Sequence, residues 1–322
     1  MSVFRRAGCA LAGLTLLTPV LALPASAEDY PDRKITFLVG FAPGGGIDTF
    51  ARVIAQALSE KFGWQIVVEN RPGAASNLAA KLVSNATPDG YTLLATGNSY
   101  AINQTLYKNP GYATEDIAPI AFVALDSQAF AVNADNPARS FKEFLEAGKQ
   151  KPFTFGYGGS SARIAAEYAI RVLAKANASG VPFQSGAPSL NALLGHHVDI
   201  NVGPVAETHP MVQQGLLRAL AVTGPHRADA LPDVPTLEEL GFTGININGF
   251  IALLAPARTP VEIRTKLNAA INAVVATPDV DRRLRVLGYE PYHGTFDDAP
   301  AFLKKQIDTW GHLIHATGIT IE

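Results

Sequence analysis

The chain has 322 residues, of which 48% are hydrophobic and 17% are charged, and its formal net charge is −2. This composition is typical of a well-packed globular protein, and the slight acidic excess provides no electrostatic attraction for nucleic acid. We therefore expect no nucleic-acid partner.

The N-terminus has the features of a secretory signal peptide. Arg5 and Arg6 precede a mostly apolar stretch, Cys9–Leu23, which leads into the small residues Ala25-Ser26-Ala27. A basic region, an apolar region and a small-x-small site in this order direct export, and the apolar region is shorter than the ~20 residues of a spanning helix. We expect residues 1–27 to be cleaved near Ala27 and the mature chain to be exported and free in solution, with the general secretory and twin-arginine routes both open.

Loss of this segment also changes the chemistry available to the mature chain. Cys9 is the only cysteine, so the mature chain is expected to have no disulfide, zinc-thiolate site or thiol nucleophile. Without Arg5 and Arg6, 24 basic residues face 28 acidic ones, a net charge of −4.

About 295 residues remain, more than a single hydrophobic core usually supports, so we expect two lobes. The predicted division is residues 28–126 plus 249–322 for lobe I and residues 127–248 for lobe II. Since no low-complexity linker separates them, the chain is expected to cross between the lobes in extended strands.

Lobe I begins with a strand, a glycine-rich loop and a helix. Ile35–Val39 is a continuous apolar run that predicts a strand, and Gly40–Gly46 follows as the loop. The next apolar residues recur at helical spacing and predict one face of a helix: Ile47, Phe50, Ala51, Ile54 and Leu58.

The same alternation continues along the chain. Further strands are predicted at Ile66–Val68, Tyr91–Ala95, Phe153–Tyr157, Val198–Val202, Ala219–Val222 and Gly249–Leu254, and helices around Leu78–Val83 and Ala162–Lys175. Strands that alternate with helices favour mostly parallel sheets with helices on both faces. The C-terminal part is expected to be helical, with Thr259 as N-cap, Pro260 at the first helical position and Glu262 at the third.

The first glycine loop, Phe41–Gly46, is a candidate anion site. Gly44, Gly45 and Gly46 stand where a strand leads into a helix, so backbone N–H groups are left unpaired at the positive end of the helix dipole. Asp48 is interpreted as a first-turn acid that fixes this loop by accepting N–H bonds. The alternative is that the glycines only permit a tight turn.

The second glycine loop, Gly158–Ser161, repeats the arrangement in lobe II and adds the hydroxyl groups of Ser160 and Ser161. The alternative for these serines is helix capping, which is compatible with ligand contact. Two such loops, one on each lobe, would hold a carboxylate from both sides.

Competing motifs are incomplete. Neither loop ends in Gly-Lys-Ser/Thr or completes the dinucleotide-binding pattern, and Gly158–Ala162 lacks the last glycine of a nucleophile elbow. His196-His197 and the pair His312 and His315 do not have the spacing of a zinc motif. We expect no catalytic residue, no metal and no cofactor.

The mature chain resembles the extracytoplasmic binding proteins of the tripartite tricarboxylate transporter, also called the Bug family. The similar segments are Phe41–Asp48, Val68–Ala74, Pro88–Leu94, Leu217–Thr223, Leu231–Thr236 and Leu253–Pro256. The resemblance implies an α/β protein with the type II periplasmic binding protein fold, in which two α/β lobes surround a ligand cleft. It also implies a carboxylate ligand, a monomer, and a membrane partner with a large and a small integral subunit.

By this resemblance, backbone amides of both glycine loops bind the ligand carboxylate, and a third loop lines the same cleft. The implied ligand-binding residues are Phe41, Ala42, Gly44, Gly45, Gly46 and Asp48 in the first loop, Asn98 and Ser99 in the third, and Tyr157, Gly158, Gly159, Ser160 and Ser161 in the second.

The chain departs from the family pattern at the outer end of the cleft. Phe183 replaces a tyrosine, Gly203-Pro204 replaces an acid and an amide, and Arg163 stands where a histidine is frequent. We expect these residues to set ligand choice, with Arg163 either facing a second carboxylate or lying in solvent. The identity of the carboxylate stays open.

Two other functions remain open on the sequence. An exported binding protein of this kind can serve a signalling receptor instead of a transporter. An α/β enzyme that acts on an anionic substrate would also use glycine loops, although no nucleophile or metal set supports it.

Overall fold

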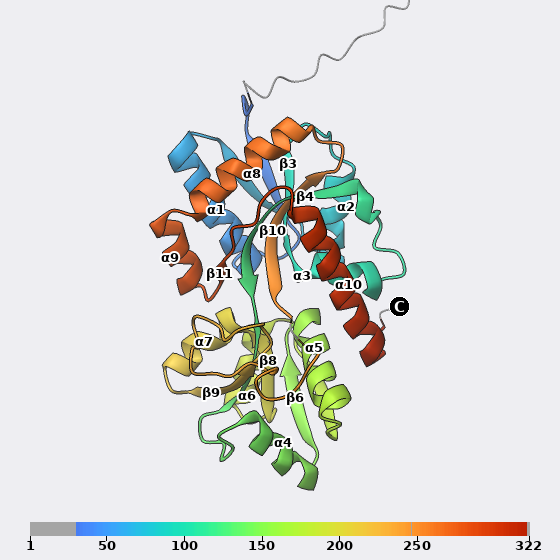
Figure 1. Cartoon of the computed structure of the whole chain (residues 1–322), viewed down its shortest axis with the longest axis vertical. Helices are drawn as coiled ribbons and strands as arrows, with labels where there is room; N and C mark the ends of the chain where they lie inside the picture. Colours follow the sequence, from blue (N-terminus) through green and yellow to red (C-terminus); the bar gives the residue numbers. More distant parts are fainter. Residues whose placement is uncertain (1–29, 246, 321–322) are drawn as a thin grey trace, which may run out of the picture.

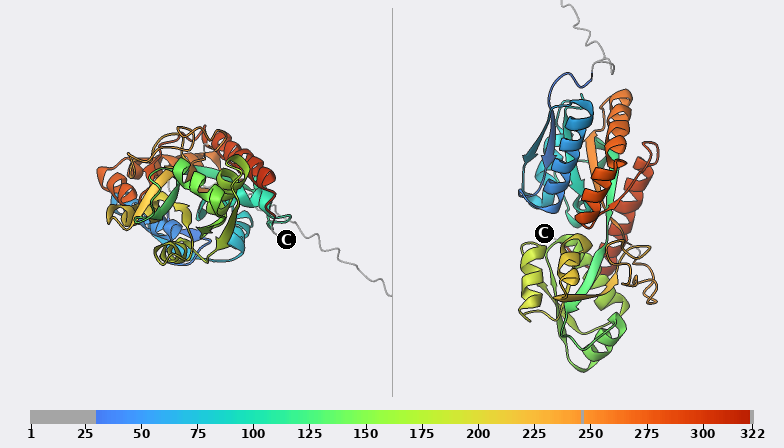
Figure 2. Two further views of the ribbon diagram at one scale, coloured as in Figure 1. Left: turned by 90° about the horizontal axis from the view of Figure 1, so that it is seen from below. Right: turned by 90° about the vertical axis from the view of Figure 1, so that its left-hand side faces the viewer.

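A computed structural model describes residues 30–245 and 247–320, so the predicted signal peptide lies outside the described residues. Two α/β lobes are stacked along the long axis of the molecule (Figure 1), and the side view shows them as separate bodies joined by a narrower waist (Figure 2). The predicted fold class is confirmed. We name the lobes by the predicted division at residues 126/127 and 248/249.

Lobe I is built on a six-stranded sheet with the strand order β11-β4-β10-β3-β1-β2. Its strands are β1 (Ile35–Val39), β2 (Ile66–Asn70), β3 (Thr92–Gly97), β4 (Ile117–Asp126), β10 (Gly249–Pro256) and β11 (Glu290–Pro291). Strands β2 and β3 run parallel to β1, whereas β10 is antiparallel to both β3 and β4.

Helices cover both faces of this sheet, as expected from the sequence. One face is covered by α1 (Gly46–Phe62), α8 (Val261–Val275) and α9 (Pro278–Val286), whose apolar residues form a single core with the strands. The other is covered by α2 (Asn77–Ser84), α3 (Asn98–Leu106) and α10 (Ala299–Thr317). Short 3-10 turns occur at Ala74–Ser76 and Thr114–Asp116.

Lobe II has a five-stranded sheet with the order β7-β6-β8-β5-β9. The strands are β5 (Gln128–Asn133), β6 (Phe153–Tyr157), β7 (Ala178–Pro182), β8 (Ile200–Pro204) and β9 (Leu217–Val222). The α4 (Phe141–Gln150) and α5 (Ser160–Ala166) helices pack on one face, and α6 (Gly186–Leu194) and α7 (Val205–Gln213) pack on the other.

The prediction of mostly parallel sheets is wrong for the strands at the waist. In lobe II, β5 is antiparallel to both β8 and β9, and in lobe I β10 is antiparallel to its neighbours. The physical reason is the crossing itself: a strand that leaves one sheet and continues into the other enters the second sheet from its opposite end.

The first crossing is extended, as predicted, because β4 ends at Asp126 and β5 begins at Gln128 with only Ser127 between them. The return runs through residues 223–248, whose described part has an isolated bridge at Thr236 and no named strand, before β10 begins at Gly249. Helix α10 adds a further link, since it contacts α3 in lobe I and α5 in lobe II.

Two helix predictions need correction in detail: one helix is present but has a π-helical second half, and another starts one residue later than predicted. The helix predicted over Ala162–Lys175 ends as α5 at Ala166 and continues as a π-helical segment over Glu167–Leu173, after which the N–H of Ala174 bonds the carbonyl of Ala169. Helix α8 has Pro260 as its N-cap with ψ near 141°, so the helix starts one residue later than predicted. The Thr259 hydroxyl is consequently no cap.

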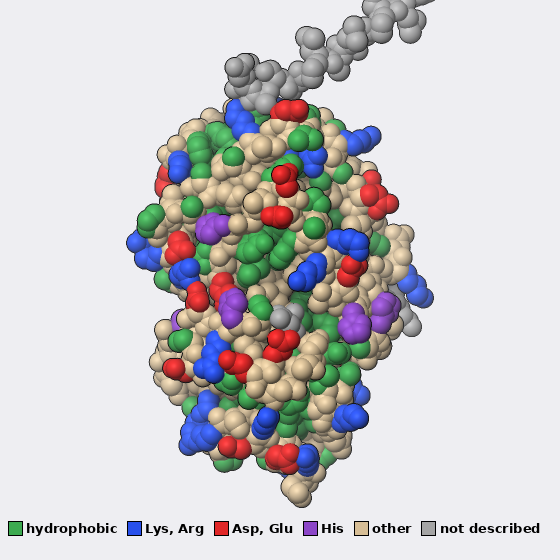
Figure 3. All heavy atoms as spheres, in the orientation of Figure 1, with side chains coloured by type: hydrophobic (Ala, Val, Ile, Leu, Met, Phe, Trp, Pro, Cys, Tyr) green, Lys and Arg blue, Asp and Glu red, His purple; other side chains and the backbone are tan. Residues whose placement is uncertain are grey.

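No helix within the described ranges is long and apolar enough to cross a membrane. The space-filling view shows acidic and basic side chains interspersed on the visible face (Figure 3).

Candidate functional site

The strand directions bring three loops to the waist. The β3 strand runs in the same direction as β4, because both are antiparallel to β10, so its carboxyl end lies at the edge where β4 leaves lobe I. Likewise β8 is antiparallel to β5, so β8 and its parallel neighbour β6 end where β5 enters lobe II. The loops that follow β1, β3 and β6 therefore lie at the facing edges of the two sheets, where α/β proteins bind ligands.

Asp48 fixes the first glycine loop through a network of hydrogen bonds. The Gly44 N–H donates to Asp48 Oδ2 at 2.8 Å, and the Asn70 side-chain amide donates to Asp48 Oδ1 at 2.9 Å and to the Phe41 carbonyl at 3.0 Å. The guanidinium of Arg52 closes the arrangement with an ion pair of 2.9 Å to Asp48. Gly44 has φ +83°, a conformation that side chains rarely adopt.

Asp48 is 2% exposed and both of its carboxylate oxygens have protein donors. Burial by itself would raise its pKa, but the hydrogen bonds from Arg52, Gly44 and Asn70 hold the pKa below its ordinary value. Asp48 thus fixes the loop by accepting the Gly44 N–H, the role that the sequence predicts. Sequence reasoning missed Arg52 and Asn70, which lie on α1 and at the end of β2.

Two amide groups of this loop are bonded within the protein, since the Gly44 N–H donates to Asp48 Oδ2 at 2.8 Å and the Gly45 N–H donates to the Ala42 carbonyl at 3.4 Å. Helix α1 begins at Gly46 after the N-cap Gly45, and no side chain caps it. Residues 42–46 are exposed, and the first N–H groups of a helix have no partner within the helix. The Tyr289 side chain lies beside the loop, since a methyl group on Gly46 would lie 2.3 Å from its hydroxyl oxygen.

The third loop is fixed to the waist through Asn98. Its Oδ1 accepts the Phe250 N–H at 2.7 Å, and a methyl group on Gly249 would lie 2.3 Å from its Nδ2. Ser99 has a buried hydroxyl with no hydrogen-bond partner among the described residues. Asn98 is thus tied to the start of β10, and the contact of Asn98 and Ser99 with ligand stays a prediction.

The second glycine loop lines a small cavity of about 70 Å³. The other residues of the lining come from the starts of α5, α6 and α7: Ser161, Ala162, Gly186, Pro204 and Glu207, beside Gly158 and Gly159. Gly158 is required there, because a methyl group on it would lie 2.1 Å from the Ser185 backbone. Since Gly159 is the N-cap of α5 and no side chain caps the helix, the capping alternative for Ser160 and Ser161 is wrong.

Glu207 is a functional candidate that sequence reasoning missed. Its Oε2 lies 1.5 Å from the position that a methyl group on Gly186 would occupy, so a carboxylate borders the cavity of the second glycine loop. Burial raises the pKa of Glu207. The sequence feature that could have found it is the position of Glu207, an acid in the first turn of the helix that follows the predicted strand Val198–Val202.

Of the residues predicted at the outer end of the cleft, Phe183 and Arg163 both lie beside Tyr157, since the Phe183 N–H donates to the Tyr157 carbonyl at 2.9 Å. The Arg163 guanidinium lies 6.0 Å from the ring centre of Tyr157, and its Nε is buried without a partner among the described residues. Pro204 lines the cavity, and Gly203 is buried one residue earlier in β8. Phe183 packs into an apolar cluster of lobe II, which gives it a packing role, so its contact with ligand stays a prediction.

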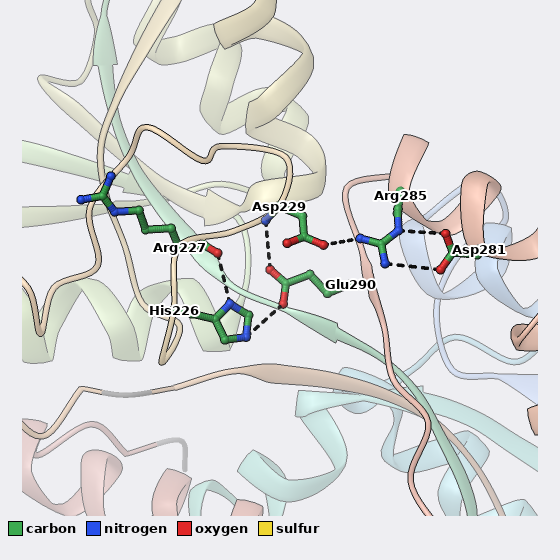
Figure 4. A network of polar contacts seen from close by, with 6 residues as sticks. All are labelled: His226, Arg227, Asp229, Asp281, Arg285 and Glu290. Carbon is green, nitrogen blue, oxygen red and sulfur yellow. Dashed lines mark hydrogen bonds and ion pairs between the residues drawn. The ribbon is translucent and has the colours of Figure 1, made fainter. Parts of the chain in front are cut away.

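A polar network joins the two lobes on the side of α7 and α9 (Figure 4). Arg285 on α9 pairs with Asp281 on the same helix and with Asp229 of lobe II. Glu290 of lobe I accepts the Asp229 N–H at 3.3 Å and lies 3.7 Å from His226 Nε2. These contacts bridge the waist.

A larger hollow of about 630 Å³ lies elsewhere, lined by Phe62 and Trp64 at the carboxyl end of α1 and by residues of α8. Helix α1 has 17 residues and spans about 25 Å, with the glycine loop at its other end. This hollow is therefore separate from the cleft. Within the described residues, no three His, Cys, Asp or Glu side chains are placed to hold a metal ion.

Comparisons with known proteins agree with this geometry. Residues 50–319 match the model of the tripartite tricarboxylate transporter family receptor. The chain is 31% identical over 313 residues to a protein in the tcbD-tcbE intergenic region of Pseudomonas sp. (strain P51), with 96% of this chain and 92% of that one covered.

Two solved structures are similar over nearly their whole length. One is an R. palustris protein with adipate, with a TM-score of 0.82, 29% identity and coverage of 91% of this chain and 99% of that one. The other is the periplasmic binding protein BugD, with a TM-score of 0.79, 29% identity and coverage of 91% and 100%.

Proposed function

The chain belongs to the tripartite tricarboxylate transporter receptor family, and from this premise we propose that it captures a small carboxylate between its lobes and delivers it to a tripartite tricarboxylate-type membrane transporter. The family consists of solute-binding receptors, and its structural relatives are periplasmic binding proteins. The adipate complex of one relative supports a carboxylate as the ligand class.

The observation that carries the proposal is the first glycine loop. Residues 42–46 are exposed, no side chain caps α1, and Asp48 holds the loop in position by accepting the Gly44 N–H. A helix of 17 residues adds the positive end of its dipole. This arrangement supports binding of a ligand carboxylate by backbone N–H groups, with Asn98, Ser99 and the second glycine loop completing the cleft.

The remaining parts of the proposal follow from family membership. They are cleavage of the signal peptide near Ala27, action as a monomer in the periplasm, transfer to a large and a small integral membrane subunit, and the lobe boundaries used above. The absence of a catalytic role belongs to the same proposal. Delivery to a signalling receptor is the second candidate, and a pull-down from membranes separates it from transport.

The test is a thermal-shift screen of the mature protein against a carboxylate library. A ligand at 100 times its dissociation constant stabilises the folded state by ~2.7 kcal/mol, which is readily measured. Chemical turnover of an ester or phosphate, with no shift by any carboxylate, would favour an enzyme instead.

Closure of the lobes on the ligand is part of the proposal. Ligand that touches both glycine loops should draw the lobes together by a hinge motion at Ser127 and Asn248. Solution scattering of the apo and ligand-saturated protein should then give different radii of gyration, whereas identical profiles would indicate a rigid cleft.

A further inference from the structure

Tyr289 combines a buried ring with a hydroxyl group that has no partner. The side chain is 7% exposed, and its ring belongs to the core that α1, α8 and α9 form with the lobe I sheet. No hydrogen bond joins the hydroxyl to any of the described residues, and its oxygen is not sealed from solvent as that of Ser99 is. Because buried tyrosine hydroxyls nearly always have a hydrogen-bond partner, this one is available to a partner from outside the chain.

The Tyr289 hydroxyl points at the start of α1. A methyl group on Gly46, the first residue of α1, would lie 2.3 Å from the hydroxyl oxygen but 3.7 Å from Cζ, so the tip of the side chain is the part that approaches the helix. The hydroxyl oxygen therefore lies within about 5 Å of the Gly46 nitrogen, given standard backbone dimensions.

The backbone amides beside this hydroxyl also have no partner. The N–H groups of Gly46, Ile47 and Asp48 bond no carbonyl and no side chain among the described residues, and the first amides of a helix have no acceptor within it. Each N–H···O or O–H···O bond spans roughly 2.7–3.0 Å, so donors within about 5 Å of each other can reach the same carboxylate. The hydroxyl and the amides are thus placed to bind one anion together.

The chain on either side of Tyr289 holds the hydroxyl in position. Gly288 has φ +79° and turns the chain after α9, and a methyl group on it would lie 2.4 Å from Ala206 Cα in lobe II. The Tyr289 N–H donates to the Leu284 carbonyl at 2.9 Å. The next residue, Glu290, belongs to the polar network of Figure 4. The hydroxyl is therefore in place before a ligand arrives, and little conformational freedom is lost on binding.

The charges around Tyr289 keep its hydroxyl a donor. Burial raises the pKa of Tyr289, and the charges of Asp126 and Glu207 raise it further, so the hydroxyl retains its proton. Burial also raises the pKa of Asp126 and of Glu207, which lowers the repulsion that these acids exert on an anion. A protonated phenol can donate to a carboxylate, and hydrogen bonds to a charged acceptor are the stronger kind.

We propose that Tyr289 is a ligand-binding residue, whose hydroxyl donates a hydrogen bond to the same ligand carboxylate that the first amides of α1 bind. The site at the first glycine loop then consists of backbone N–H groups and one side-chain O–H group. This inference rests on the proposed function, since it adds a donor to the same site.

The test removes the hydroxyl and keeps the ring. The unbranched monoacids from propanoate to hexanoate and the diacids from succinate to adipate are titrated by calorimetry into the mature protein, and each acid that binds is titrated into Tyr289→Phe. We expect about tenfold weaker binding, the effect of one hydrogen bond to a charged group. The melting temperature of the ligand-free variant should equal that of the parent, because no hydrogen bond within the protein is lost.

Tyr168→Phe is the matched control. Tyr168 is also 7% exposed and its hydroxyl also has no hydrogen bond among the described residues, but it lies in the π-helical segment of lobe II, where a methyl group on Gly244 would be 3.4 Å from it. This variant should bind every acid within about twofold of the parent.

A second pair of variants tests the position of the hydroxyl without any ligand. Gly46→Ala places a methyl group against the Tyr289 hydroxyl and should lower the melting temperature of the parent. In the Tyr289→Phe background the nearest remaining atom is Cζ at 3.7 Å, an ordinary contact, so the same substitution should lower it less. An equal loss in both backgrounds would show that the hydroxyl does not face Gly46 and would overturn the inference.

The outcomes separate this inference from the proposed function. Acids that bind Tyr289→Phe as tightly as the parent, or that lose affinity equally in Tyr168→Phe, would overturn the role of Tyr289 and leave the carboxylate function standing. If no carboxylate of the library binds the parent, the proposed function fails and the inference fails with it.

Discussion

The two glycine loops both lead from a strand into a helix, yet the acid beside each has an opposite environment. Asp48 is surrounded by donors, which lower its pKa and keep it charged beneath the first loop. Glu207 has no partner among the described residues, and burial raises its pKa at the second loop. The strand-glycine-helix pattern therefore determines where amides point, whereas side chains from other elements determine the charge that the amides meet.

The largest expected effect is the difference in stability between two variants, Asp48→Asn and Glu207→Gln. Asp48→Asn removes the charge that holds Arg52 and the Gly44 N–H, so we expect a loss of ~2–3 kcal/mol of stability and a loss of ligand affinity. Glu207→Gln removes only an unpaired carboxylate, so stability should be unchanged or higher. Chemical denaturation of both variants measures the difference, and equal destabilisation would show that the two loops are not distinguished in this way.

The next contrast concerns the backbone amides. Gly45 has φ −73°, which suits proline, and its N–H bonds the Ala42 carbonyl at only 3.4 Å. Gly45→Pro should therefore keep the turn. It should lower carboxylate affinity at least tenfold, because proline has no backbone N–H and its ring crowds the neighbouring amides.

Gly159→Ala is the matched control in lobe II. A methyl group there meets no atom within 4 Å, and φ is −172°. We expect less than about a twofold change in affinity, since no N–H is lost. Calorimetry with a ligand from the screen compares the two variants, and equal affinity of Gly45→Pro and the parent would remove the first loop from the site.

The pKa shifts predict a pH dependence of opposite sign for the two kinds of acid. Asp126 has a raised pKa, so the folded state takes up its proton at a higher pH than the unfolded chain does, and the penalty of the buried charge is present at neutral pH and relieved as pH falls. Asp48 has a lowered pKa, so its stabilisation is present above its ordinary value of 3.8 and lost as pH falls through the lowered value.

Melting temperatures of the parent and of Asp126→Asn between pH 8 and pH 3 test this sign. The variant should melt a few degrees higher than the parent at pH 8, since ~1 kcal/mol corresponds to ~2–4 °C, and the difference should vanish on the acid side. A constant difference across the range would mean that Asp126 does not titrate with a raised pKa.

The sequence predicts the parts of this comparison that depend on local patterns. Ile35–Val39 and Phe153–Tyr157 form strands with the predicted bounds, and Asp48 bonds the loop four residues before it. The relations between distant elements were missed: Asn70 reaches the loop from β2, and Glu207 reaches Gly186 from α7. Spacing along the chain does not report such contacts, because they depend on how the elements pack.

Asp126 has a feature in the sequence that the site prediction did not use. It is the only charged residue in the strand Ile117–Asp126 and closes a long apolar run at the crossing between lobes. Asp126 is half-buried where the chain crosses between the lobes, and its Oδ1 atom is buried without a hydrogen-bond partner among the described residues. The antiparallel strands at the waist have no such feature in the sequence, because their direction depends on how the chain crosses from one sheet to the other.

The smallest expected effect concerns Arg163, at the outer end of the second glycine loop. Its side chain lies over the Tyr157 ring and is partly exposed, so an ion pair with a second ligand carboxylate is screened by solvent and contributes ~0.5–1 kcal/mol. Arg163→Ala should then lower the affinity for a diacid about two- to fivefold and leave the matching monoacid unchanged. Arg171→Ala, which removes an arginine paired with Glu167 further along the same helical segment, controls for loss of a surface charge. Equal binding of monoacid and diacid by parent and Arg163→Ala would place Arg163 outside the site.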